Sequence, residues 1–259
     1  MQITDPDLIA YLMHRAGERE IHARERKIIR KALELNVPTP DFASTFGKNE
    51  LPTYIGFIDL KGFSSAVHGR RPAEIARYLE PFLSRIINIL RRAHMLIDKT
   101  MGDEVMFVLP ETEEEAQSPE VLFLGQAMGG LHDLAFELEG VYRYRIGLAY
   151  GQASFLHIEG AGYSEWTVVG EVVQVAKRLH GVPELAEPDP VIGAFGMQLG
   201  GGSVSHVRKT MRERLSIFAG FASRFRHDLK DSPFSLKGVG DVLYAVLWPR
   251  AERVPNKRA

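Results

Sequence analysis

The chain has 259 residues, of which 45% are hydrophobic and 25% charged, as is ordinary for a soluble globular protein. A formal net charge of −1 argues against a nucleic-acid-binding surface, and the lack of cysteine excludes disulfides and thiolate metal sites. The sequence shows no secretory leader, and no apolar run approaches the roughly 18 residues of a membrane helix. We therefore expect a cytoplasmic protein that binds neither membranes nor nucleic acid.

The first predicted element is a charge-rich amphipathic helix over residues 7–35, which fits either a solvated face or a dimerising arm. A proline-containing linker follows, so residues 1–50 are expected to precede the main domain. The apolar run 54–60 predicts a buried strand, which Gly62 ends. Residues 72–92 then predict a helix, because Pro72 suits its first turn and a wide apolar stripe follows.

The remainder of the chain alternates strands and helices. Residues 94–109 predict a hairpin that turns at Gly102. In chain order we then expect a helix over 118–138, strands over 142–150 and 152–158 hinged at Gly151, a loop over 160–165, a strand over 166–169, a helix over 170–180, a strand over 190–195, a long helix over 206–229, and strands over 234–237 and 243–248. We expect Arg143, Arg145 and the arginines of 206–229 to face solvent.

This order of elements predicts an α+β fold rather than a doubly wound parallel sheet. The main domain is expected over 51–250, with a helical insertion at about 200–232 and a disordered tail over 251–259. Sequence motifs of a P-loop, a dinucleotide fingerprint and a His-Glu-x-x-His zinc site are all missing.

Two aspartates occupy predicted turns. Asp59 ends the first strand, and Asp103 lies on the hairpin turn. If the two strands are neighbours, these carboxylates converge at one sheet edge and suit a hard cation such as Mg²⁺ or Mn²⁺. The alternative is two unrelated turn residues.

A second candidate lies on the predicted helix 170–180. Gln174 and Arg178 are four residues apart, so both project from the same face. An amide and a guanidinium aimed at one point suit sugar and phosphate oxygens, whereas the alternative is a surface polar stripe.

Three segments together resemble the class III nucleotidyl cyclase catalytic domain. They are Phe-Ile-Asp-Leu-Lys-Gly-Phe at 57–63, Lys-Thr-Met-Gly-Asp at 99–103, and Thr-Val-Val-Gly-Glu-Val-Val-Gln-Val-Ala-Lys-Arg at 167–178. The resemblance covers roughly residues 51–182, and 234–247 resembles the closing strands. It implies a ferredoxin-like core with an antiparallel or mixed sheet, to which the predicted helices over 7–35 and 206–229 add an N-terminal arm and an extra C-terminal helix.

The resemblance also implies a homodimer with shared active sites that converts a nucleoside triphosphate to a 3′,5′-cyclic nucleotide and pyrophosphate. Asp59, Asp103 and the Leu60 carbonyl would hold two Mn²⁺ or Mg²⁺ ions. Arg178 would stabilise charge on the α-phosphate, and Gln174 replaces the usual asparagine that positions the ribose. The implied substrate-binding residues are Tyr54, Phe57, Gly62, Phe63, Ser64, Lys99, Thr167 and Lys237.

Base specificity depends on few residues. Lys99 stands where adenylyl cyclases carry lysine and guanylyl cyclases glutamate, which argues against GTP, yet it suits the carbonyls of uracil or cytosine equally. With Tyr54 filling space beside a small base, the chain looks most like the pyrimidine cyclases of the Pycsar antiphage system. We favour UTP conversion to cyclic UMP, a messenger read by a separate effector protein. The alternatives are an adenylate cyclase and, because of Gln174, a catalytically degenerate nucleotide-binding or dimerisation module.

Overall fold

The computed structural model describes residues 31–32, 50–111, 120–138, 142–186, 189, 191–200, 202–221 and 225–250. Its strands are β1 (Leu51–Leu60), β2 (Leu96–Met101), β3 (Glu104–Pro110), β4 (Tyr144–Gly160), β5 (Tyr163–Val169), β6 (Val191–Gln198), β7 (Phe225–Leu229), β8 (Phe234–Leu236) and β9 (Gly240–Pro249). Its helices are α4 (Phe63–Val67), α5 (Pro72–Arg92), α6 (Glu120–Glu137), α7 (Glu171–Arg178) and α8 (Val204–Phe221), with 3-10 turns η1 (Leu179–Gly181) and η2 (Pro183–Ala186).

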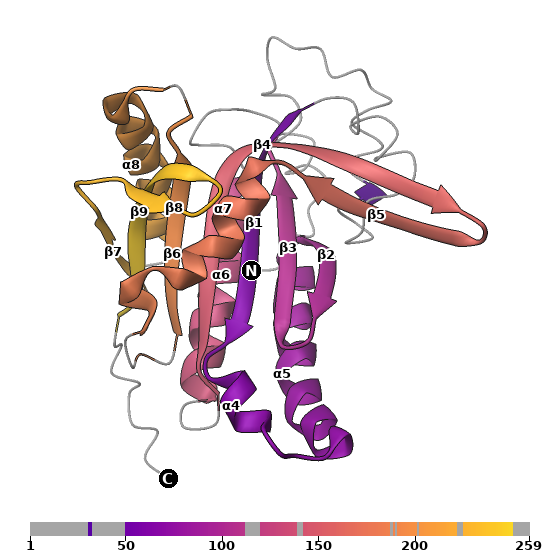
Figure 1. Cartoon of the computed structure of the whole chain (residues 1–259). Helices are drawn as coiled ribbons and strands as arrows, with labels where there is room; N and C mark the ends of the chain where they lie inside the picture. Colours follow the sequence, from indigo (N-terminus) through magenta and orange to yellow (C-terminus); the bar gives the residue numbers. More distant parts are fainter. Residues whose placement is uncertain are drawn as a thin grey trace.

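Across this described part of the chain, the strands form one mixed sheet in the order β2-β3-β1-β4-β6-β9-β7, with β5 paired to β4 and β8 to β9. The pairing of β4 with β6 is parallel, and β1 lies antiparallel to both β3 and β4. Helices α5, α6 and α8 pack on one face of the sheet and α7 on the other (Figure 1). The predicted α+β fold is confirmed.

Strand β1 is an interior strand of the sheet, because β3 pairs with one of its edges and β4 with the other. Its side chains alternate between the two faces of the sheet. Tyr54 and Ile58 join the core under α5, α6 and α8, while Ile55 and Phe57 join the core under α7. The same alternation puts Asp59 on the α7 face, at the end of the strand.

Helix α7 lies unusually close to the sheet. A Cβ atom on Gly147 of β4 would lie 2.2 Å from the carbonyl oxygen of Ala176, so only glycine allows this approach. Buried Val172, Val175 and Ala176 face the sheet. The helix is therefore held firmly while its outer side stays exposed.

The predicted division of residues 142–158 into two strands at Gly151 is wrong. Residues 144–160 form the single strand β4, because Gly151 pairs with Thr53 of β1 instead of breaking the chain. From Ser154 onward β4 leaves the main sheet and pairs with β5, whose residues 163–165 lie in the predicted loop. The resulting β4–β5 hairpin extends past the body of the sheet (Figure 1).

The predicted helix over 206–229 is also wrong in its second half. Helix α8 ends at Phe221, and residues 225–229 form β7, which pairs with β9 at the sheet edge. Strand pairing with a distant segment outweighs the helical spacing of the apolar residues. The predictions for residues 72–92 and for the hairpin at 94–109 are confirmed, and helix α6 matches the predicted 118–138 to within two residues.

Most of the predicted arm over 7–35 and the tail over 251–259 lie outside the described residues. Among the helices that are described, none combines the length and apolar character needed to cross a bilayer.

Candidate functional site

Asp59 and Asp103 come together at one end of the sheet. Strand β1 pairs with β3 through Ile58 and Val105, so the β2–β3 turn lies beside the end of β1. Burial, and then the neighbouring Asp59 carboxylate, raise the pKa of Asp103 to about 6. The structure therefore brings together the two acids that the sequence places on separate turns.

The acid pair has the donor chemistry of a hard-cation site. Two adjacent carboxylates repel one another, and a divalent cation with oxygen ligands relieves that repulsion. In the described ranges, no group of three or more His, Asp and Glu side chains is placed to hold a metal. Further ligands would have to come from backbone carbonyls, such as that of Leu60, and from the substrate.

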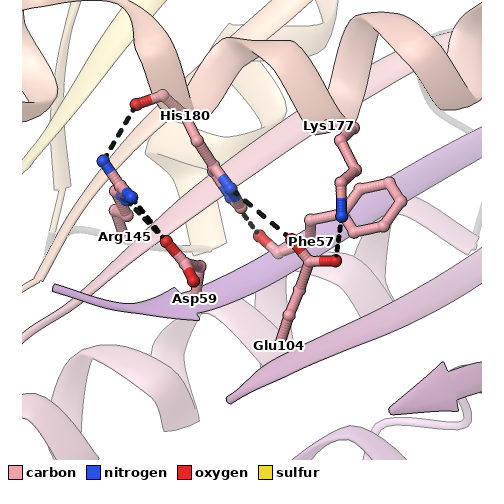
Figure 2. A network of polar contacts seen from close by, with 6 residues as sticks. All are labelled: Phe57, Asp59, Glu104, Arg145, Lys177 and His180. Carbon is pink, nitrogen blue, oxygen red and sulfur yellow. Dashed lines mark hydrogen bonds and ion pairs between the residues drawn. The ribbon is translucent and has the colours of Figure 1, made fainter. Parts of the chain in front are cut away.

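Arg145 is a site residue that the sequence reasoning missed. It lies directly opposite Asp59 in the β1–β4 ladder. Its Nε and Nη2 atoms lie 2.8 Å and 2.7 Å from the same carboxylate oxygen, Oδ2 (Figure 2). The prediction that Arg145 is solvated is wrong, because the carboxylate on the neighbouring strand pairs with it.

The contact extends from Asp59 to α7 through His180. Arg145 donates to the His180 carbonyl at 3.3 Å, and His180 Nε2 lies 3.0 Å from the carbonyl oxygen of Phe57 (Figure 2). Burial lowers the pKa of His180, so a neutral ring with its proton on Nε2 fits this contact. The expectation that the histidines lie mostly at the surface fails for this residue.

Glu104 completes this network on the α7 face. Its carboxylate lies 2.5 Å from Lys177 Nζ and 4.0 Å from His180 Nδ1 (Figure 2). Lys177 also lies over the ring of Phe57. The end of α7 is thus tied by charge to the same strands that carry the acid pair.

Gln174 and Arg178 are both exposed on the outer side of α7. A Cβ atom on Gly238 would lie 3.6 Å from Arg178 Nη2, so the guanidinium lies beside the turn that carries the exposed Lys237. No hydrogen bond or ion pair between described residues joins Arg178 to Asp59 or Asp103. These exposed groups are free to meet another molecule.

Lys99 and Thr167 meet across the space between β2 and β5. The Lys99 ammonium donates to the Thr167 hydroxyl at 3.0 Å, although 68 residues separate them in the chain. Lys99 is also 3.2 Å from Asp98, a residue that the sequence reasoning did not single out. Burial raises the pKa of Asp98 to about 6, and the nearby Glu165 raises it too, whereas Lys99 lowers it.

The β4–β5 hairpin that carries Thr167 also carries exposed apolar side chains. Residues opposite one another in the β4–β5 ladder share a face, and Leu156 lies opposite Thr167. The large apolar side chains left exposed on the hairpin are Leu156, Ile158, Tyr163 and Val169, and Met101 is exposed at the end of β2. Exposed apolar residues gathered on an extended hairpin are typical of an association surface.

The structure does not bring Tyr54 to this site. Its side chain is 0% exposed, on the sheet face opposite to Asp59, and its hydroxyl accepts a hydrogen bond from Arg214 of α8. Positions 54 and 59 have opposite parity in one strand, so their side chains point to opposite faces. Phe57 does share the face of Asp59, but α7 covers its ring.

Gly62, Phe63 and Ser64 follow directly after the acid-bearing strand. Gly62 adopts a positive φ of 74°, and the short helix α4 begins at the next residue. The turn reverses the chain beside Asp59. Its backbone is thereby placed next to the candidate cation site.

No protein-family model matches the chain. It is 29% identical over 147 residues to an uncharacterised protein of Mycobacterium tuberculosis, covering 57% of this chain and 26% of that protein. It is 24% identical over 132 residues to an adenylate cyclase of Anabaena cylindrica, covering 49% of this chain and 26% of that protein. The chain thus spans about a quarter of the length of these relatives.

Solved structures give broader coverage. The adenylyl cyclase CyaB of P. aeruginosa aligns with a TM-score of 0.55 at 15% identity, over 79% of this chain and 97% of that one. The guanylate cyclase domain of RhGC from Catenaria anguillulae, solved with GTP, aligns with a TM-score of 0.54 at 16% identity, over 77% and 97%. The chain therefore has the fold of class III adenylyl and guanylyl cyclase catalytic domains.

Proposed function

We propose that this protein is a nucleotidyl cyclase that converts a nucleoside triphosphate to a 3′,5′-cyclic nucleotide and pyrophosphate. One observation carries the proposal: the cyclase fold brings Asp59 and Asp103 together at a sheet end while β2 and β5 join Lys99 to Thr167. A fold alone does not assign chemistry. Here the acid pair supports a cation site, and the separate Lys99–Thr167 pair supports a site for the base.

The acid pair would hold two divalent cations, with the Leu60 carbonyl as a further ligand. When bound, such ions lower the pKa of the ribose 3′-hydroxyl and neutralise triphosphate charge. The chain's own residues prepare this site. Arg145 holds one oxygen of Asp59 in place, and the Gly62–Ser64 backbone lies beside the acids to receive phosphate oxygens.

The active site would be completed by a second copy of the chain. The apolar hairpin surface gives that copy a place to dock, and docking there covers the Lys99–Thr167 pair. Arg178, exposed on α7, would then stabilise the charge that develops on the α-phosphate. Gln174 would contact the ribose, and Lys237 the triphosphate.

For the base we favour uracil, so that UTP gives cyclic UMP for a separate effector protein in antiphage defence. This choice rests on the family resemblance and on Lys99, whose ammonium donates to a carbonyl acceptor. Tyr54 gives it no support, because its hydroxyl is engaged by Arg214 in the core. The second candidate is ATP, whose adenine ring nitrogen is an equally good acceptor.

A non-catalytic nucleotide-binding module is the alternative from another class. Gln174 favours it, since one extra methylene displaces the amide expected at the ribose. The acid pair opposes it, because binding alone does not require two adjacent carboxylates beside a phosphate-binding turn.

The test is to incubate the protein with ATP, GTP, CTP or UTP and Mn²⁺ and identify products by mass. We expect one 3′,5′-cyclic nucleotide and pyrophosphate. The turnover rate of Asp59→Ala should be at least about 100-fold lower than that of the wild-type chain, because a cation-holding carboxylate is removed. The exposed Asp231→Asn, with its side chain 98% exposed, should retain full turnover. Nucleotide binding without any cyclic product would favour the non-catalytic module.

A further inference from the structure

Asp98 lies directly behind Lys99 in the candidate base site. We propose that Asp98 is a positioning residue that fixes the Lys99 ammonium, so that the site selects its nucleobase through one directed hydrogen-bond donor. This inference rests on the proposed function and adds to it a specificity-determining residue outside the three segments that carry the resemblance.

A β-bulge creates the arrangement. Consecutive side chains in a regular strand point to opposite faces, so Asp98 and Lys99 would normally diverge. The β2–β3 register shifts between Ile97 and Lys99, which leaves Asp98 as the extra residue. Its Oδ2 atom consequently lies 3.2 Å from Lys99 Nζ, and its side chain is 0% exposed.

The Lys99 ammonium has three N–H donors, and the protein directs two of them. One donates to Thr167 at 3.0 Å, and another faces Asp98. The Lys99 side chain remains 33% exposed, so the third donor can meet a ligand. A single directed donor requires an acceptor on the ligand, either a ring nitrogen or a carbonyl oxygen.

Charge compensation shows which part of the substrate this donor suits. The Asp98 carboxylate balances the ammonium, and Glu165 adds further negative charge nearby. A triphosphate carries several negative charges and prefers uncompensated cations. A neutral base is therefore the matching ligand for the Asp98–Lys99–Thr167 group.

Asp98 is also costly to keep. Neither of its oxygens meets the geometry of a hydrogen bond to another described residue, so the 3.2 Å ion pair with Lys99 has to offset the cost of burying the carboxylate. An asparagine at this position would remove most of that cost. Retention of the charge is expected where it serves a site rather than the core.

The experiment measures base preference without turnover. Each of the four 3′-deoxynucleoside triphosphates lacks the attacking hydroxyl, so it binds without cyclising. Their dissociation constants with Mn²⁺ are measured by calorimetry for the full chain and for Asp98→Asn, Thr167→Val and the exposed control Asp231→Asn. Inorganic tripolyphosphate, which has no base, probes the phosphate part alone.

We expect Asp98→Asn and Thr167→Val each to raise the dissociation constant of the preferred triphosphate about tenfold, which corresponds to one hydrogen bond to a charged group. Ratios among the four bases should move toward one, while tripolyphosphate and the control stay unchanged. Equal weakening of all five ligands, or no change, would overturn the inference. If the wild-type chain binds with base preference but makes no cyclic product, the proposed function fails, and the Asp98→Asn and Thr167→Val binding constants alone decide the inference. If it binds none of them, both fail.

Discussion

The pKa values of Asp98 and Asp103 are both raised to about 6, although the charged neighbours of the two carboxyls differ. Burial is the largest cause for both, but Asp103 also faces the carboxylate of Asp59, whereas Asp98 faces the ammonium of Lys99. The repulsion between the carboxylates of Asp59 and Asp103 can be relieved by a cation from outside the chain. Asp98, in contrast, already has a cation from the same chain beside it, the ammonium of Lys99. The two carboxylates are therefore suited to different parts of a nucleotide.

At the scale of the residue, Asp98→Asn should stabilise the fold at pH 7. Because the folded pKa of about 6 exceeds the ordinary value of 3.8, ionisation favours the unfolded chain, and stability falls as pH rises through that window. The variant should gain at most about 3 kcal/mol at pH 7, by the conversion of a two-unit shift to free energy.

Urea unfolding at pH 7 and at pH 4 measures this gain. The difference between Asp98→Asn and the wild-type chain should be largest at pH 7 and small at pH 4, where Asp98 is mostly protonated in the fold. Glu165 and Lys99 face Asp98, so both must be unchanged in the comparison. A gain that does not depend on pH would contradict the assignment to Asp98.

At the scale of the element, strand pairing decides which groups meet. The end of β1 carries Asp59, and the antiparallel register of β4 delivers Arg145 to it. The end of α7 is held to the same strands by His180, Lys177 and Glu104. A continuous set of side-chain contacts therefore connects the end of α7 to Asp59, through His180 and Arg145.

Arg145→Gln should lower turnover by about 10- to 100-fold, the usual effect of removing a residue that orients a metal ligand. Both contacts to Asp59 Oδ2 are lost, so the carboxylate is no longer held for a cation. The matched control is Arg143→Gln, an exposed arginine two residues earlier. Steady-state kinetics at several Mn²⁺ concentrations should show weaker Mn²⁺ activation for Arg145→Gln only.

Helix α8 is joined to the sheet by a buried arginine. Arg214 is 1% exposed, lies 3.0 Å from Glu111 Oε2 and stacks at 3.4 Å on the ring of Tyr150. It also donates to the Tyr54 hydroxyl. The expectation that the arginines of 206–229 face solvent is therefore wrong for Arg214, because Glu111, which follows β3, pairs with it in the core.

Arg214→Met should destabilise the fold by about 3–5 kcal/mol, the cost of leaving a buried charge without its partner. Arg214→Met combined with Glu111→Gln should recover part of the loss, since the carboxylate is then removed as well. Arg212→Met, at an exposed position of the same helix, serves as the control. Urea unfolding measures all three, and equal losses for Arg212→Met and Arg214→Met would contradict the assignment.

At the scale of the whole molecule, the acid pair lies at one end of the sheet, and the Lys99–Thr167 contact joins β2 to the exposed apolar β4–β5 hairpin. Arg178 is exposed and joined to none of these acids within the described part of the chain. A second copy docked on the hairpin accounts for both facts, because each active site would then combine groups from two chains.

Mixing Asp59→Ala with Arg178→Ala should therefore restore activity that neither variant has alone. Random exchange into dimers with one intact site out of two should give about a quarter of the wild-type rate. Mixing Asp59→Ala with Asp103→Ala is the matched control, since both broken acids then leave no intact site. Turnover is measured after exchange of labelled subunits has been verified, and no recovery in either mixture would place each site within one chain.

The sequence by itself determined the α+β order of elements, the turn at Gly62 and the place of both aspartates at strand ends. These follow from local patterns, since apolar periodicity and turn residues act over a few neighbouring positions. Strand alternation also assigns Tyr54 and Asp59 to opposite faces of the sheet, because an odd number of positions separates them in one strand.

Only the tertiary structure decided that Arg145 pairs with Asp59 across 86 residues, that Lys99 meets Thr167 across 68, and that Arg214 is buried against Glu111 across 103. It also decided that β4 continues through Gly151, that residues 225–229 leave the helix to join β9, and that a bulge turns Asp98 toward Lys99. Strand register and burial set these outcomes, because the partner of a polar side chain is the group that folding brings opposite to it, at any distance along the chain.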